Sequence, residues 1–266
     1  MSRSPRIITL TTDFGLSDHF VGAMKGVIAS IAPAARVIDI SHEIAPFEIL
    51  EGAFVIGQAW ANFPKGTIHV IVVDPGVGSA RRPILAEAGG HCFIAPDNGV
   101  LSMVYDAAKP ARPKIRVISN PKLLARAVSR TFHGRDVFAP AAAHLARGVA
   151  PARFGKIIDD EIHLPDIKPS RSAAGWRGMV LKVDRFGNLI TNFHRDEFAN
   201  IASQPFELST PSAVIRRFAE TFSEVPEGEL AAIFGSSGFL EIAANQHSAA
   251  KLLGCGVRSP LNLRFL

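Results

Sequence analysis

Cysteine, tyrosine and tryptophan are scarce in this chain, and long apolar runs are missing. Only two cysteines occur in 266 residues, Cys92 and Cys255, and they lie far apart without metal-ligand spacing. This usage provides no disulfide framework and fits a reducing compartment, so we expect a cytoplasmic protein. No apolar run approaches the roughly 18 residues of a membrane span, and the first residues lack a signal-peptide pattern. We therefore expect neither secretion nor membrane insertion.

The motifs of several enzyme classes are also missing. The glycine-rich stretch 76–81 lacks the third glycine of a dinucleotide-binding loop, and no Gly-Lys-Ser/Thr phosphate loop is present. There is no His-Glu-x-x-His pair, so we expect no metal and no bound cofactor. The net charge is +5, but the basic residues are scattered. We therefore expect no nucleic-acid partner.

Strand and helix patterns alternate in the first part of the chain. Apolar residues make up 47% of the sequence, enough for a folded core. The stretches 6–10, 37–40 and 67–73 predict buried strands, and Glu48–Trp60 predicts a helix. A further helix begins near Ser17 or Asp18 and should bury Phe20, Met24, Val27 and Ile31. Apolar strands between helices predict a mainly parallel sheet covered on both faces, that is, an α/β domain.

The pattern changes near residue 165. Pro165, Pro169 and Gly175 lie in a stretch of low periodicity, which indicates a linker. Short strand-like runs separated by turns follow it and predict a small antiparallel barrel or sandwich. The expected organisation is an α/β N-terminal domain over 1–165, a linker over 166–178 and a small all-β C-terminal domain over 179–266.

Two carboxylates are expected at one edge of the predicted sheet. Asp13 and Asp74 each follow a strand, and ligands of such sheets bind beyond the carboxyl ends of the strands. Arg81 follows Asp74 by seven residues, and His133 precedes a helix predicted over 135–147. Taken alone, these residues fit an ion pair beside a surface histidine as well as they fit a reactive centre.

Several ordered motifs together resemble the S-adenosylmethionine hydroxide adenosyltransferases, hydrolytic relatives of the fluorinase and chlorinase enzymes. The resemblance spans nearly the whole chain. It rests on the segments 11–15 (TTDFG), 39–42 (DISH), 46–47 (PF), 74–78 (DPGVG), 131–136 (TFHGRD), 184–188 (DRFGN) and 235–238 (GSSG). The resemblance implies an α/β domain joined to a β-barrel domain, assembled as a homotrimer with its active site at the subunit interface.

The resemblance also implies roles for individual residues. It makes Asp74, Arg81 and His133 the set that activates water for attack on S-adenosylmethionine, giving adenosine and methionine. We expect His133 to accept the proton from water, although Asp74 remains the alternative acceptor. Substrate contacts are expected from Asp13, Phe47, Phe132, Asp184, Asn188, Ser236 and Ser237. Phe222 is a candidate for stacking on adenine.

Three alternative functions stay open at this level. The first is halide transfer to the same carbon, which an anionic Asp74 disfavours by repelling halide. In our alignment Gly134 also replaces a serine that helps to hold halide in the fluorinase. The second is a protein that binds adenosyl compounds without converting them, and the third is a metal-dependent hydrolase. The turn-forming propensity of Asp184 and of the two serines is likewise an alternative to substrate binding.

Overall fold

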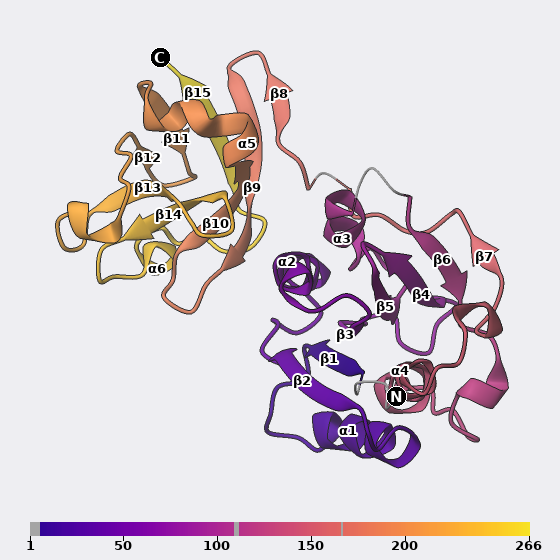
Figure 1. The fold of residues 1–266 in the computed structure, drawn as a ribbon. Coiled ribbons are helices and arrows are strands. Elements are labelled where there is room, and N and C mark those ends of the chain that lie inside the picture. Colours follow the sequence, from indigo (N-terminus) through magenta and orange to yellow (C-terminus); the bar gives the residue numbers. More distant parts are fainter. Residues whose placement is uncertain (1–5, 109–111, 166) are drawn as a thin grey trace. The chain divides into compact units, whose positions relative to one another are not determined.

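The computed structural model describes residues 6–108, 112–165 and 167–266 and divides into two compact units, residues 1–164 and 165–266. Figure 1 shows the elements of each unit. The first unit has these elements: β1 (Ile7–Thr12), α1 (Phe20–Ile31), β2 (Arg36–Ser41), α2 (Ile49–Ala59), β3 (Ile68–Val72), β4 (Pro83–Ala88), β5 (His91–Pro96), α3 (Ser102–Ala107), β6 (Lys114–Val117), α4 (Ala139–Ala146) and β7 (Ile157–Ile158). A π-helical turn, Gly134–Phe138, leads directly into α4.

The sheet of the first unit is parallel at one side and antiparallel at the other. Its strand order is β2-β1-β3-β5-β4-β6-β7, and the pairs β1–β2, β1–β3 and β3–β5 are parallel. Strands β4, β6 and β7 pair in antiparallel fashion. The predicted α/β class with a parallel sheet is confirmed, with an antiparallel extension that the sequence pattern did not show.

Alternate residues of the strands pack under different helices. Ile8 and Val70 join a core with residues of α1 and α4, whereas Ile71 joins a second core with residues of α2 and α3. The sheet is therefore covered on both faces, as expected for parallel strands that alternate with helices along the chain. Because β1 and β3 are parallel neighbours, the residues that follow them emerge at the same edge of the sheet.

Helix α1 differs in detail from the sequence prediction. It begins one or two residues later than expected, after His19, whose side chain makes no capping hydrogen bond. Its fully buried residues are Val21, Met24 and Ile28, so the buried stripe is centred about one residue away from the predicted one. Helix boundaries are the part of a helix that an apolar pattern determines least well, because helix ends fray.

The second unit is an antiparallel, barrel-like sheet. Its strands and helices are β8 (Ser170–Ser172), β9 (Gly175–Val183), β10 (Leu189–His194), α5 (Arg195–Phe198), β11 (Phe206–Ser209), β12 (Val214–Ile215), β13 (Leu230–Phe234), β14 (Phe239–Ala244), α6 (Ala249–Leu253) and β15 (Pro260–Phe265). The order is β12-β11-β15-β9-β10-β14-β13, with β8 on β9, and β12 contacts β13 so that the sheet nearly closes. The predicted all-β barrel-like C-terminal domain is confirmed.

The stretch expected to be a linker is partly structured. Strand β8 and the first residues of β9 lie within residues 166–178 and form a hairpin. Gly175 turns this hairpin with φ +136°, where a Cβ atom would lie 2.3 Å from the carbonyl oxygen of Leu263. Polar side chains on this exposed edge hide the strand periodicity, which explains the difference.

Candidate active site

Two carboxylates lie at the carboxyl ends of neighbouring strands. Asp13 follows β1, and Asp74 comes two residues after the end of β3. The Oδ2 atom of Asp13 accepts a hydrogen bond of 2.9 Å from the backbone N–H of Phe47. Burial raises the pKa of Asp13, the bond from Phe47 opposes that shift, and the charge of Asp74 adds to it. The sheet thus brings together the two acidic residues that the sequence placed at one edge.

Asp74, Arg81 and His133 form one hydrogen-bonded group. The Nε atom of Arg81 donates to Oδ1 of Asp74 at 3.1 Å, and Nη2 donates to Oδ2, so the pair is bidentate. The Nη2 atom also lies 3.0 Å from Nδ1 of His133. The side chains of Arg81 and Asp74 are only 7% and 5% exposed. The ion pair is therefore largely shielded from water.

The turn after Asp74 allows this approach. Gly78 has φ +78°, and a Cβ atom there would lie 2.3 Å from the carbonyl oxygen of Arg130. Only glycine permits this close packing against the segment that leads to His133. The buried carboxylate of Asp136 accepts from the backbone N–H of Ser129 at 2.9 Å and anchors the same segment.

The electrostatics of the group set the state of each member. Burial raises the pKa of Asp74, and the Arg81 guanidinium opposes that shift. Burial, reinforced by Arg81, lowers the pKa of His133, so its imidazole is neutral near pH 7. A guanidinium can only donate hydrogen bonds, so Nδ1 of His133 must accept. The neutral ring then carries its hydrogen on Nε2, which is a donor and not an acceptor.

A hollow of about 260 Å³ lies beside this group. It is lined by Asp13, Phe14, Phe20, Pro46, Phe47, Val72, Asp74, Val77, Thr131, Phe132, His133 and Gly134. Phe132 packs against Phe14 and Phe20 with ring centroids 6.0 and 5.1 Å apart. An apolar hollow that contains two carboxylates suits an organic cation with an apolar body.

Phe47 takes an unusual backbone conformation at this hollow. Its φ of +69° lies in the left-handed region, although it is not glycine, and its side chain is 71% exposed. The hydrogen bond from its N–H to Asp13 holds this conformation. Strained residues of this kind cluster at ligand sites, where the surrounding structure fixes them.

The predicted site residues of the second unit lie on two turns. Asp184 and Asn188 belong to the turn between β9 and β10, whereas Ser236 and Ser237 lie between β13 and β14. Oδ1 of Asp184 accepts from the backbone N–H groups of Phe186 and Asn188, and Oδ2 accepts from the side chain of Asn188 at 2.9 Å. The turn role of Asp184 is therefore real, whatever else this residue does.

Asn188 also lines a hollow of about 340 Å³, together with Phe186, Phe222, Ala244, Gln246 and His247. Phe186 is 80% exposed, so its ring face is available to a ligand. Phe222, the aromatic residue singled out in the sequence, thus shares a hollow with Asn188. The sequence reasoning missed Phe186 as well as Phe14 and Phe20 as site-lining residues. Phe14 and Phe186 each lie inside one of the recognised motifs, which is the signal that could have identified them.

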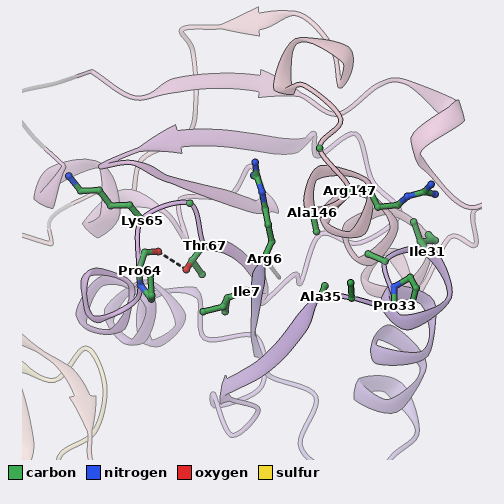
Figure 2. Close-up of a pocket in the computed structure, with 14 residues that line it drawn as sticks. Arg6, Ile7, Ile31, Pro33, Ala35, Pro64, Lys65, Thr67, Ala146 and Arg147 are labelled. Carbon is green, nitrogen blue, oxygen red and sulfur yellow. Dashed lines mark hydrogen bonds between the residues drawn. The ribbon is translucent and has the colours of Figure 1, made fainter. Parts of the chain in front are cut away.

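A larger hollow, of about 940 Å³, lies at the opposite ends of the strands, where β1 and β3 begin. Figure 2 shows that the charged ends of Lys65 and Arg147 point away from one another there. Arg147 is also the residue that follows the carboxyl end of α4, where a cation interacts favourably with the helix dipole. This hollow contains none of the predicted site residues.

Within residues 6–108, 112–165 and 167–266, no group of three or more His, Cys, Asp or Glu side chains is arranged to hold a metal ion. No helix in these ranges is long and apolar enough to cross a membrane.

The fold and the site define a class: a two-unit enzyme in which an α/β unit carries a carboxylate, guanidinium and imidazole group and a barrel-like unit follows. The N-terminal domain of the S-adenosylmethionine (SAM) hydroxide adenosyltransferases matches residues 8–155, and their C-terminal domain matches residues 178–262. The chain therefore belongs to the SAM hydroxide adenosyltransferase family.

Individual relatives agree with this assignment. The chain is similar to an (R)-S-adenosyl-L-methionine hydrolase of Thermus thermophilus, with 37% identity over 97% of this chain and 99% of the relative. A protein of the same name from Salinispora arenicola is 39% identical over 92% and 93% of the two chains. The fluorinase of Nocardia brasiliensis is more distant, at 28% identity over 92% of each chain.

A solved structure also resembles this chain. It is described as an uncharacterized conserved protein from Thermotoga maritima and superposes with a TM-score of 0.88. The two sequences are 37% identical over 96% of this chain and 99% of the other.

Proposed function

We propose that this chain hydrolyses S-adenosyl-L-methionine to adenosine and L-methionine by attack of water at the 5′ carbon. The observation that carries the proposal is the group of Asp74, Arg81 and His133 beside an apolar hollow that also contains Asp13. Relatives at 36% to 39% identity are named (R)-S-adenosyl-L-methionine hydrolases, which supports the same reaction.

In the proposed reaction, an oxygen of water forms a bond to the 5′ carbon while the bond from that carbon to sulfur breaks. The electron pair of the breaking bond stays on sulfur, which leaves as neutral methionine thioether. The water gives up one proton. Because hydroxide and sulfonium neutralise one another, the transition state loses charge, and a dry apolar hollow favours it.

The geometry favours Asp74 as the proton acceptor and not His133. In the hydrogen-bonded group, Nδ1 of His133 is occupied by Arg81, so its Nε2–H is a donor; in our proposal it donates to the water oxygen and orients one of its lone pairs toward carbon. Burial raises the pKa of Asp74 and so makes it a better base than an exposed aspartate. Arg81 carries a permanent positive charge that stabilises developing hydroxide. This proposal selects Asp74 from the two proton acceptors that the sequence left open.

The remaining substrate contacts follow from the two hollows. In our proposal, Asp13 accepts hydrogen bonds from the ribose hydroxyls, and Phe47 and Phe132 enclose the reacting carbon. The rings of Phe186 and Phe222, together with the amide of Asn188, suit a planar base. Ser236 and Ser237 have hydroxyls that can donate to the methionine carboxylate.

We further propose a homotrimer in which the first unit of one subunit and the second unit of a neighbour share one substrate molecule. The hollow of the first unit, about 260 Å³, is smaller than the roughly 300 to 1,000 Å³ usual for a ligand of this size. The groups suited to the base line the hollow of the other unit, and the serines proposed for the amino-acid end lie on a turn of that unit. Both cysteines are free, which supports a cytoplasmic location, and we propose that neither a metal nor a cofactor takes part.

The products distinguish this proposal from its alternatives. Protein pretreated with chelator is incubated with SAM, with and without chloride, and the nucleoside is identified by liquid chromatography and mass spectrometry. Adenosine and methionine in both samples are the expected result, and His133→Ala should abolish them. A halogenated deoxyadenosine would indicate halide transfer, whereas bound but unconverted SAM would indicate a sensor.

A further inference from the structure

His42 is a buried polar residue that the proposed reaction does not use. It ends the segment 39–42 (DISH), directly after β2, and its side chain is only 3% exposed. Its Nδ1 atom lies 2.8 Å from Oγ1 of Thr12, the fully buried last residue of β1. Neither residue lines the hollow beside Asp74. Any effect of His42 on a substrate must therefore pass through the residues that it contacts.

Asp39 determines which ring nitrogen of His42 carries the hydrogen. Nε2 of His42 lies 3.0 Å from Oδ1 of Asp39, in an ion-pair contact that is not aligned as a hydrogen bond. Burial acts to raise the pKa of Asp39, but Lys25 and His42 outweigh it and lower the pKa, so Asp39 is a carboxylate at neutral pH. A carboxylate oxygen repels a lone pair on Nε2. In the neutral ring the hydrogen therefore lies on Nε2, and Nδ1 is an acceptor.

This tautomer fixes the direction of the Thr12 hydroxyl. The hydroxyl donates its single hydrogen to Nδ1 of His42, and its oxygen accepts from the backbone N–H of Phe14 at 3.2 Å. The second bond closes a turn of the kind that threonine hydroxyls form with the residue two positions later. The turn encloses Asp13, so one hydroxyl links His42 to the backbone on both sides of that carboxylate.

The same segment holds the turn at two further points. The backbone N–H of Gly15 donates to the carbonyl oxygen of His42 at 2.8 Å. The backbone N–H of Phe47 donates to Oδ2 of Asp13 at 2.9 Å. Residues 12–15 are thus attached to residues 42–47 on either side of Asp13, and the side chain of His42 supplies the attachment at the end of the strand.

A second threonine–histidine pair on β1 has the same geometry without this link. Oγ1 of Thr9 lies 2.8 Å from Nδ1 of His69 in β3, and both residues are fully buried. Thr9 precedes Thr12 by three residues, which is about 10 Å along a strand. The pair of Thr9 and His69 therefore shows what a buried histidine contributes to stability alone.

We propose that His42 is a positioning residue for substrate binding, which fixes the turn around Asp13 through Thr12 and so directs the Asp13 carboxylate at the ribose hydroxyls. The proposal rests on the proposed function, since the ribose belongs to that substrate. Binding groups must be held within about 0.5 Å of their productive position by the residues that support them. The ribose hydroxyls do not react, so loss of His42 should weaken recognition more than the chemical step.

The test compares adenosine, the proposed product, with 2′,3′-dideoxyadenosine by isothermal titration calorimetry on the full-length protein. Wild-type protein should prefer adenosine. In His42→Leu, adenosine should bind about 10-fold more weakly, as expected for impaired hydrogen bonds to a charged group, whereas binding of the dideoxynucleoside should not change. His42→Asn should restore most of the preference, because its Oδ1 takes the place of Nδ1. His69→Leu is the matched control and should retain the wild-type preference.

Steady-state kinetics supply a second readout. In His42→Leu the KM for SAM should rise about 10-fold, whereas kcat should stay within about twofold of wild type. A purely structural role would give the opposite division, because partial unfolding reduces the concentration of active protein and so lowers the apparent kcat without changing KM or the preference for adenosine.

Each outcome decides the proposal. An unchanged preference in His42→Leu, the same loss in His69→Leu, no recovery in His42→Asn, or no preference in the wild type would overturn it while hydrolysis of SAM by wild-type protein stands. If wild-type protein neither binds adenosine nor converts SAM, the proposed function fails and the role of His42 fails with it. Should His42→Leu not fold, Thr12→Val carries the test, since it removes the hydroxyl at similar shape, and Thr12→Ser should restore the preference.

Discussion

Removing both charges of the buried pair of Asp74 and Arg81 should restore part of the stability that either single change removes, but should not restore activity. Both side chains are nearly inaccessible, and Nη1 of Arg81 already lacks a hydrogen-bond partner within the described residues. Asp74→Asn leaves a buried guanidinium without its counter-charge, and Arg81→Met leaves a buried carboxylate. Either change should cost about 3–5 kcal/mol of unfolding free energy.

The double variant Asp74→Asn/Arg81→Met removes both charges together. Its loss of stability should be smaller than the sum of the single losses by about 1–3 kcal/mol, because no buried charge remains uncompensated. Hydrolysis should nevertheless stay at least about 100-fold below wild type in all three variants, since proton acceptor or cation is missing from each. Stability is thus partly restored while activity is not.

The assay is urea unfolding followed by tryptophan fluorescence. Trp60 lies in the first unit and Trp176 in the second, so Trp176→Phe makes the signal specific to the unit that contains the pair. The exposed pair of Lys25 and Asp39 is the control, and its cycle should give no more than about 1 kcal/mol. Additive losses for the buried pair, or an active double variant, would refute the reasoning.

Three further predictions follow from the structure. Because burial and Arg81 hold the pKa of His133 below 6.5, kcat should be constant above about pH 6.5 and fall only below it. A kcat that already falls by half above pH 7 would contradict this. Burial lowers the pKa of His69 to about 3, against 6.5 in the unfolded chain. Between these two pH values the unfolded chain binds more protons than the folded one. The free energy of unfolding should therefore fall as the pH falls, by up to about 1.4 kcal/mol per pH unit. His69→Gln should flatten that dependence in acid unfolding curves. Phe47→Gly should raise the unfolding free energy by up to about 1 kcal/mol, because glycine adopts the left-handed backbone conformation without strain. The same change should raise KM for SAM. An unchanged KM would show that Phe47 does not contact the substrate.

Apolar periodicity predicted the main strands and helices, and the residues that follow parallel strands predicted which side chains meet at the edge of the sheet. Strands β1 and β3 are mostly buried runs that pair in parallel, and their neighbouring ends place Asp13 and Asp74 together, as expected. Short elements escaped prediction. Strands such as β7 and β12 have two residues each, too few for any period to be visible.

The finer chemistry depends on contacts that no local pattern records. The tautomer of His133 follows from Arg81, which lies 52 residues away along the chain. In the sequence Glu241 stands among apolar residues of a predicted strand, and only the structure shows that its side chain is buried against Gly235. Such properties arise from contacts between residues that are far apart in the chain, which sequence spacing does not determine.

The most direct test of the account is hydrolysis of SAM in heavy-oxygen water, with the position of the label read from both products by mass spectrometry. The account predicts one heavy oxygen on the 5′ carbon of adenosine, none in methionine, and labelled adenosine formed at least about 100-fold more slowly by Asp74→Asn. Unlabelled adenosine, or labelled product formed at the wild-type rate by Asp74→Asn, would contradict attack by a water molecule activated at this site.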